Sequence, residues 1–215
     1  MGNTLIMNKL KKIINNFFFR LHEKNDALLK VKQQNSINDF NKKNAIIGSN
    51  TRIFSEAKIN NNLDDKTKIV IGDNCDIKGE LLTFGHGGEI IIGNYSFVGE
   101  RTKIWSAKKI IIGDRVLISH NVNIHDNNSH PLDSKLRHED FKHIAIIGLP
   151  KENHHLDEKE IIIENDVWIG FNSSIMKGVR IGKGAIIGAN TIITKDVPDF
   201  AVCLGNPMRI IKYVL

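Results

Sequence analysis

The sequence predicts a mainly β protein, a parallel β-helix built from hexapeptide repeats, with an α-helical extension before it and a long loop within it. Three observations predict this fold: an aliphatic residue that returns every six residues, a basic amphipathic segment at the start, and one long interruption of the repeat. We expect the extension at residues 1–44, the β-helix at residues 45–206 and a tail at residues 207–215.

The N-terminal segment carries the whole excess of positive charge. Residues 1–46 hold nine Lys or Arg against three acids, whereas residues 47–215 hold 21 of each sign. Apolar residues recur at helical intervals between the lysines, at Leu5, Ile6, Leu10, Ile13, Ile14, Phe17 and Phe18. We therefore predict an amphipathic helix that packs on its own domain or on a partner subunit, or that touches an anionic membrane surface through residues 1–20.

The chain shows neither an apolar run of about twenty residues that could span a membrane nor the pattern of a secretory signal. We expect a cytoplasmic protein, free or at the inner face of the membrane, with no nucleic-acid partner. Cys75 and Cys203 lie far apart and neither belongs to a Cys-x-x-Cys motif. We therefore expect two small buried residues and neither a disulfide nor a structural zinc site.

The repeat itself is regular after residue 160. An isoleucine returns every six residues without a gap, at Ile163, Ile169, Ile175, Ile181, Ile187 and Ile193. Six is not a helical period, so each interval predicts a short strand followed by a turn, and three strands form a coil of about 18 residues. Each isoleucine then stacks on those of the neighbouring coils.

The corners of the coil have their own sequence signal. Gly and Asn follow the isoleucine in IGFN and IGAN, and these residues suit corners with left-handed or crowded backbone. Hexapeptide repeats with this signature are associated with left-handed coils, an exception to the usual right-handed crossover.

The interruption lies between Ile124 and Ile163. It contains Pro131, Pro150 and a dense mixture of charges, and seven of the nine histidines lie between His120 and His155. We expect an excursion loop at about residues 127–160, and an insertion of this length in a compact domain is usually functional.

Four short motifs of the chain are more specific than the repeat: SHP at His130, NDVWIG, IGANTIITKDVP and GNPMR. Over about residues 90–212 the chain resembles the hexapeptide-repeat acetyltransferases, in particular the group of maltose, galactoside and bacterial polysaccharide O-acetyltransferases. The resemblance implies transfer of an acetyl group from acetyl-CoA to a saccharide hydroxyl. It also implies a homotrimer with active sites between neighbouring chains, and no metal.

In the family that the chain resembles, the histidine matching His130 is the general base. A sugar hydroxyl is a poor nucleophile until its proton is being removed, and a neutral imidazole can take that proton near neutral pH. We expect direct transfer without an acyl-enzyme. Asp126, Asp133 and Glu139 are the candidates for the group that orients the imidazole.

A cofactor groove is predicted on the C-terminal coils. Phe171, Ala189 and Pro207 are 18 residues apart, so they should stack on three successive coils. By resemblance, the backbone at Phe171 and Ala189 contacts the pantetheine arm of coenzyme A. The resemblance also places Thr194 and Lys195 near the far end of the cofactor, Arg209 and Lys212 at its phosphates, and Trp168 at the acetyl or acceptor end.

The acceptor side departs from the family pattern. Gly99 and Ala107 stand where sugar-acetylating relatives carry polar residues, so those contacts do not transfer. Arg101 and Trp105, together with Glu100 and the excursion loop, are expected to form a different pocket. The preferred acceptor is a saccharide unit of a capsule, lipopolysaccharide or similar glycan.

Other functions fit parts of the sequence. A sugar-nucleotide N-acyltransferase and a serine acetyltransferase would share the coil and the cofactor. The spacing of His86, His120 and His125 resembles the three-histidine zinc site of hexapeptide-repeat carbonic anhydrases. That reading gives no account of His130-Pro131, the TKD segment or GNPMR.

Overall fold

The computed structural model describes residues 2–148, 150–152 and 155–214, and within helix α1 (Gly2–Asn44) it describes no side chains at residues 2–14, 30, 33–35 and 38. The chain divides into two compact units, Met1–Phe40 and Asn41–Leu215, which we describe separately.

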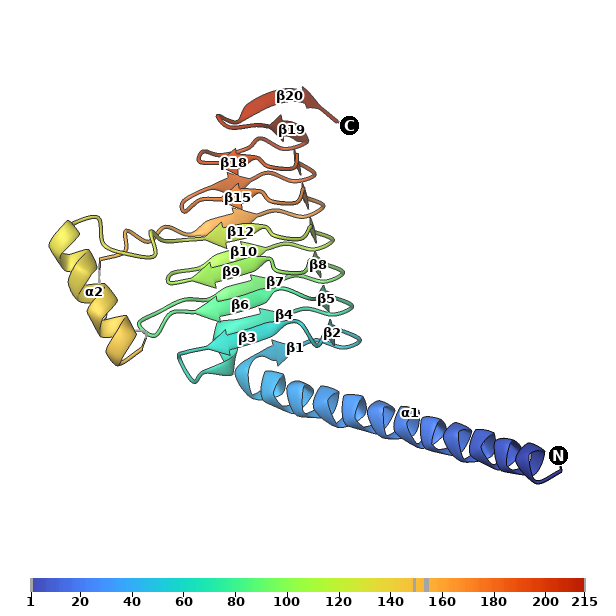
Figure 1. Cartoon of the computed structure of the whole chain (residues 1–215). Coiled ribbons are helices and arrows are strands. Elements are labelled where there is room, and N and C mark those ends of the chain that lie inside the picture. Colours follow the sequence, from blue (N-terminus) through green and yellow to red (C-terminus); the bar gives the residue numbers. More distant parts are fainter. Residues whose placement is uncertain (1, 149, 153–154, 215) are drawn as a thin grey trace. The chain divides into compact units, whose positions relative to one another are not determined.

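The second unit is a stack of coils made of three sheets (Figure 1). Sheet A contains β1 (Ile46–Ile47), β4 (Ile69–Ile71), β7 (Ile90–Ile92), β10 (Ile110–Ile112), β13 (Ile161–Ile163) and β16 (Arg180–Ile181). Sheet B contains β2 (Arg52–Ile53), β5 (Asp76–Ile77), β8 (Phe97–Val98), β11 (Leu117–Ile118), β14 (Trp168–Ile169), β17 (Ile186–Ile187), β19 (Ala201–Leu204) and β20 (Arg209–Tyr213). Sheet C contains β3 (Lys58–Asn61), β6 (Glu80–Thr83), β9 (Lys103–Ser106), β12 (Asn123–His125), β15 (Ser174–Ile175) and β18 (Ile192–Ile193).

The isoleucine ladder forms the core of this unit, as the six-residue period predicted. Ile163 pairs in register with Ile181, Ile169 with Ile187 and Ile175 with Ile193, and all these side chains are buried. From β1 to β18 successive strands belong to sheets A, B and C in turn, whereas β19 and β20 both belong to sheet B, and every pair of named strands except β19–β20 is parallel. The parallel β-helix predicted from the sequence is therefore present.

The corners use Asn and Gly in two different ways. Asn172 and Asn190 have φ of 57° and 58°, the left-handed region that asparagine tolerates better than most residues. Gly170 is needed for space, because a Cβ there would lie 2.6 Å from the backbone nitrogen of Ala189. The corner between sheets B and C, here called the BC corner, contains these residues. The CA corner joins sheet C to sheet A and contains residues 126–160 and 194–196.

The last coil is shorter than the period predicted. Ile187 of β17 pairs with Cys203 of β19, an interval of 16 residues and not 18. The position equivalent to Ala189 is therefore held by Gly205. Our prediction that Pro207 stacks on Ala189 is wrong. The interval from β17 to β19 is two residues shorter than the interval from β14 to β17.

The interruption leaves the stack at the CA corner and contains a helix, α2 (Ser134–Ile146), that stands off from the coils (Figure 1). Asp133 caps this helix, since its side chain accepts hydrogen bonds from the backbone nitrogens of Lys135 and Leu136. The structure thus adds a helix to the predicted loop.

Asp126 anchors the beginning of the loop to sheet C. Its buried carboxylate accepts hydrogen bonds from Ser106 Oγ at 2.6 Å, from Ala107 N at 2.8 Å and from Lys108 N at 2.9 Å. The returning chain is held by Leu156, which packs with Phe84 and Ala107 in a small second apolar cluster. The loop therefore has a fixed base on the coil.

The first unit consists of α1, and the predicted N-terminal helix is confirmed. The expected apolar positions Leu5, Ile6, Leu10, Ile13 and Ile14 lie outside the described side chains, whereas Phe17 and Phe18 are described and exposed. Among the described residues, no helix is long and apolar enough to cross a membrane.

Candidate active site

His130 lies on the excursion loop, a few residues after the chain leaves β12. Its Nδ1 is 2.8 Å from Oδ2 of Asp140 on α2. The imidazole is 47% exposed, whereas the Asp140 side chain is only 3% exposed. When Nδ1 carries its hydrogen and donates it to this carboxylate, Nε2 is the basic nitrogen. A buried carboxylate therefore orients a half-exposed imidazole, as general-base chemistry requires.

The partner of His130 is none of the three carboxylates predicted from the sequence. Asp126 is engaged at the loop base and Asp133 caps α2. Glu139 is exposed and forms an ion pair with Lys142 at 2.9 Å. Asp140 was missed because the loop was predicted without a helix. Helical spacing would have placed Leu136, Asp140 and His143 on one face.

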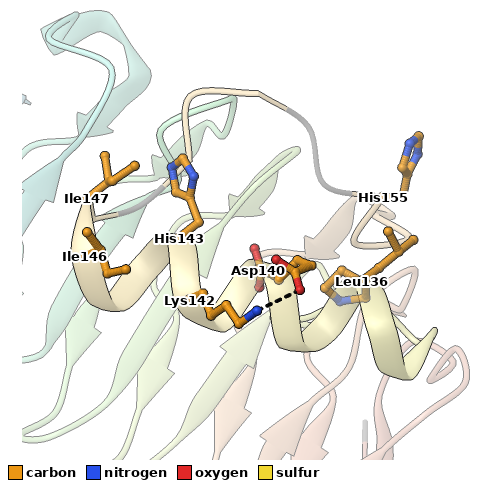
Figure 2. Close-up of a pocket in the computed structure, with 9 residues that line it drawn as sticks. Leu136, Asp140, Lys142, His143, Ile146, Ile147 and His155 are labelled. Carbon is orange, nitrogen blue, oxygen red and sulfur yellow. Dashed lines mark hydrogen bonds and ion pairs between the residues drawn. The ribbon is translucent and has the colours of Figure 1, made fainter.

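A pocket of about 480 Å³ opens beside Asp140 (Figure 2). Figure 2 shows that α2 supplies most of its wall, with Leu136, His143, Ile146 and Ile147 as sticks, and that His155 comes from the returning chain. Pro131, Glu139, Asp140 and Lys142 complete the lining. The pocket therefore offers apolar surface beside the carboxylate that contacts His130.

Two of the predicted cofactor residues, Phe171 and Ala189, occupy equivalent positions on successive coils at the BC corner. The carbonyl of Phe171 accepts a hydrogen bond from Asn190 N at 2.9 Å, which links the two coils. The exposed Phe171 ring stacks on His120, with ring centroids 5.3 Å apart. At this corner the backbone of Phe171 and Ala189 and the ring of Phe171 lie along the coil axis.

The other predicted cofactor residues lie elsewhere. Thr194 and Lys195 follow β18 at the CA corner, which is also the corner of His130. Arg209 and Lys212 are exposed on β20, the last strand of sheet B. Within one chain the predicted site residues are therefore divided among the BC corner, the CA corner and β20.

The predicted acceptor residues are also separate. Trp168 is exposed on sheet B, and Trp105 lies on sheet C, where it stacks on His125 with centroids 4.9 Å apart. Arg101 lies at the BC corner and donates from Nε to Asn121 Oδ1 at 2.9 Å. It lines a groove of about 810 Å³ over the N-terminal coils, formed by Glu56, Lys58, Lys78, Gly79, Glu80, Glu100, Arg101, Lys103, Asn121 and Asn123.

The three histidines of the zinc alternative have separate environments. His86 Nε2 is 2.7 Å from Glu158 Oε1, and His120 stacks on Phe171. His125 is partly buried and stacks on Trp105, and burial lowers the pKa of its imidazole, as does nearby Lys103, against a smaller opposite effect of Asp126. Among the residues that the structure describes in one chain, no three metal-ligating side chains form a group.

The chain was compared with known families and proteins. Residues 160–195 match the family model of the bacterial transferase hexapeptide (six repeats). The galactoside O-acetyltransferase of Escherichia coli (strain K12) is 31% identical over 160 residues, which are 74% of this chain and 71% of that enzyme. The chain spans only 60% of the galactoside O-acetyltransferase of Lactococcus lactis, over 140 residues at 29% identity, 65% of this chain.

Solved structures agree with these matches. NeuO, a polySia specific acetyltransferase, superposes with a TM-score of 0.54 at 26% identity, over 79% of this chain and 66% of that one. A galactoside acetyltransferase in complex with coenzyme A superposes with a TM-score of 0.52 at 31% identity, over 67% and 64% of the two chains. AntD, an N-acyltransferase from Bacillus cereus, has a TM-score of 0.65 over 83% and 88% of the chains, and at 23% identity this likeness shows the fold alone.

The three-sheeted coil, together with these matches, defines the class of left-handed β-helix acyltransferases. Within that class the chain belongs to the hexapeptide-repeat acetyltransferase family, to which the galactoside O-acetyltransferases also belong. The family and the fold class predicted from the sequence are both confirmed.

Proposed function

We propose that this protein is an acetyl-CoA-dependent O-acetyltransferase that modifies a saccharide hydroxyl of a bacterial surface polysaccharide. The single observation that carries the proposal is the His130–Asp140 dyad, with a half-exposed imidazole held by a buried carboxylate. The galactoside and polySia acetyltransferases among its relatives support a saccharide acceptor.

The reaction proceeds in one transfer. Nε2 of His130 takes the proton of the acceptor hydroxyl while the oxygen bonds to the acetyl carbonyl carbon of the thioester. The carbon–sulfur bond then breaks, and the proton passes from the imidazole to the thiolate of coenzyme A. Cys75 and Cys203 are buried, and burial raises the pKa of both thiols, which argues against an acyl-enzyme on either.

Coenzyme A would lie along the BC corner. Its pantetheine arm would contact the backbone at Phe171 and Ala189, and Arg209 and Lys212 would meet its phosphates. Thr194 and Lys195 lie at the other edge of sheet C, so they would approach its far end from a neighbouring copy. The related galactoside acetyltransferase solved with coenzyme A supports this donor.

The complete site would form between copies in a homotrimer. Phe171 and Ala189 lie at one edge of sheet C, whereas His130, Thr194 and Lys195 lie at the other. One copy would supply the base and its neighbour the cofactor corner, because a single chain holds these groups on different edges.

The acceptor would enter the groove that contains Arg101. Lys58, Lys78, Arg101 and Lys103 offer donors there, and Glu56, Glu80 and Glu100 offer acceptors, so hydroxyl-rich chains can bind through many hydrogen bonds. Trp168 would border the acetyl group, and Trp105 would form the apolar side of this surface. We place the reaction in the cytoplasm.

The proposal is tested by incubating the purified protein with acetyl-CoA and a panel of glycans and amino sugars, with mass spectrometry to locate the acetyl group. His130→Ala should abolish transfer and leave acetyl-CoA binding nearly unchanged. Arg209→Ala should instead raise the apparent KM for acetyl-CoA, since it touches the donor and not the chemistry. Transfer by His130→Ala at the wild-type rate would contradict the assignment.

N-acylation is the second candidate, because AntD shares the fold over most of its length. The same panel separates the two chemistries. An ester formed on a hydroxyl is cleaved by hydroxylamine, whereas an amide formed on an amino sugar survives the treatment.

A further inference from the structure

Helix α1 shows an apolar seam on its exposed surface. The seam consists of Phe17, Leu21, Lys24, Leu28 and Val31, which follow one another at intervals of four and three residues. In the sequence the same spacing continues towards the N-terminus through Ile14, Leu10 and Met7. Alternation of four and three is the heptad pattern of coiled coils, which need apolar residues at positions a and d.

Within their own unit the described side chains of this seam remain largely exposed, although the ring of Phe17 contacts that of its neighbour Phe18, with centroids 5.9 Å apart. Phe17 is 62% exposed and Leu28 51%, and every residue from 15 to 29 is exposed. Helices are marginal in water without packing of an apolar face, and the described apolar side chains of this 43-residue helix are left largely exposed within its unit. The apolar side chains of the seam would therefore be buried only by packing against a partner.

We propose that α1 binds the α1 helices of other copies of this chain in a parallel coiled coil along this seam. A second copy fits better than other partners because the apolar positions keep the 3.5-residue period over more than three heptads, from Met7 to Val31. The parallel orientation rests on the trimer of the proposed function, because a threefold axis relates copies without reversing them. Lys24 is the one polar position of the seam between Met7 and Val31, and the spacing places it at a d position.

Cross-linking tests the seam directly. Leu28→Cys places a thiol in the seam, whereas Leu29→Cys places one on the next residue, off the seam, where the side chain is 63% exposed. The two native cysteines are buried and do not interfere. Under mild oxidation we expect disulfide-linked chains for full-length Leu28→Cys and at least fivefold fewer for Leu29→Cys. Equal yields, or none for Leu28→Cys, would overturn the proposal.

Hydrogen exchange supplies the second measurement. In the full-length protein, residues 15–32 should exchange slowly, and Phe17→Asp with Leu28→Asp should remove this protection. Phe19→Asp with Leu29→Asp is the matched control, with the same residue types off the seam, and should keep it. Equal loss in both variants would overturn the proposal. Protection that arises only on adding phosphatidylglycerol vesicles would show a membrane partner and overturn it too.

The tests of the coiled coil and of the proposed acetyl transfer can fail independently of one another. If the glycan screen finds no acceptor while Leu28→Cys cross-links selectively, the coiled coil stands and the activity does not. If acetyl transfer is found and the seam does not cross-link, the activity stands and the coiled coil does not.

Discussion

At the scale of single residues, the proposed site pairs Asp140 with His130. The carboxylate is buried and lies 2.8 Å from Nδ1, so it can fix both the direction of the ring and the nitrogen that carries the hydrogen. In the proposed mechanism Asp140 acts through the imidazole and not on the substrates directly. It is a positioning residue.

Asp140→Asn should lower kcat about a hundredfold and leave the KM for acetyl-CoA unchanged. The amide of asparagine can donate to Nδ1, which favours the tautomer with hydrogen on Nε2, so the basic nitrogen no longer faces the acceptor. Steady-state kinetics with an acceptor from the glycan screen measures this. Glu139→Gln, a change to the neighbouring exposed carboxylate, is the matched control, and similar losses in both variants would contradict the role of Asp140.

His125 should make stability depend on pH. Burial under Trp105 lowers its pKa in the folded protein, whereas the unfolded chain has the ordinary value of about 6.5. Between the folded pKa and about pH 6.5 the unfolded state binds more protons, so stability falls as the pH falls through this window.

His125→Phe, which keeps an aromatic ring against Trp105, should remove this part of the acid sensitivity. The measurement is the melting temperature at about pH 7.5 and about pH 5, above and below the ordinary histidine pKa. His22→Phe serves as the control, since His22 is exposed on α1. A pH dependence unchanged in His125→Phe would show that the buried imidazole does not set it.

At the scale of elements, α2 carries Asp140 to His130. The helix begins at its cap, Asp133, and the loop that holds it is anchored at Asp126 and Leu156. The contact between Asp140 and His130 should therefore depend on whether α2 is folded.

Asp133→Ala removes the cap and should destabilise α2 by about 1 kcal/mol. We expect faster hydrogen exchange in residues 134–146 and a lower kcat, with the melting temperature of the coil unchanged, because the coil has its own core. Asp133→Ser keeps a capping oxygen and should restore both properties. A fall in kcat that the serine variant does not restore would point to another role for Asp133.

At the scale of the whole molecule, the coil separates groups that the proposed reaction needs together. His130 follows β12 at the CA corner, and Ala189 lies at the BC corner. Assembly of copies would reunite them, since each interface can bring the CA corner of one chain to the BC corner of the next.

Mixed oligomers test this arrangement. His130→Ala removes the base, and Ala189→Trp fills the cofactor corner, so each variant alone should be inactive. Co-expression should restore activity at about one site in four on random mixing, because some interfaces then join an intact base to an intact corner. Acetyl transfer by the co-purified variants is measured against each variant alone, and no recovery would mean that both groups act within one chain.

Some features were accessible from the sequence because local patterns encode them. The six-residue spacing of Ile163 and its successors fixes which side chains face inward, and Asn172 and Asn190 mark the corners. Asp140 was not accessible, since its role depends on a helix within a run of charges that carries no strong apolar period. The position of Pro207 was predicted incorrectly, because a coil can lose two residues at a corner without disturbing its strands.

The sequence by itself determined the coil and the family, and it predicted His130 as the base. The repeat makes this possible, because the same six-residue spacing recurs many times along the chain. Only the tertiary structure decided which carboxylate meets His130 and which corner holds each predicted cofactor residue. Those are contacts between segments distant along the chain, and their geometry follows from the register of whole strands and the course of one loop.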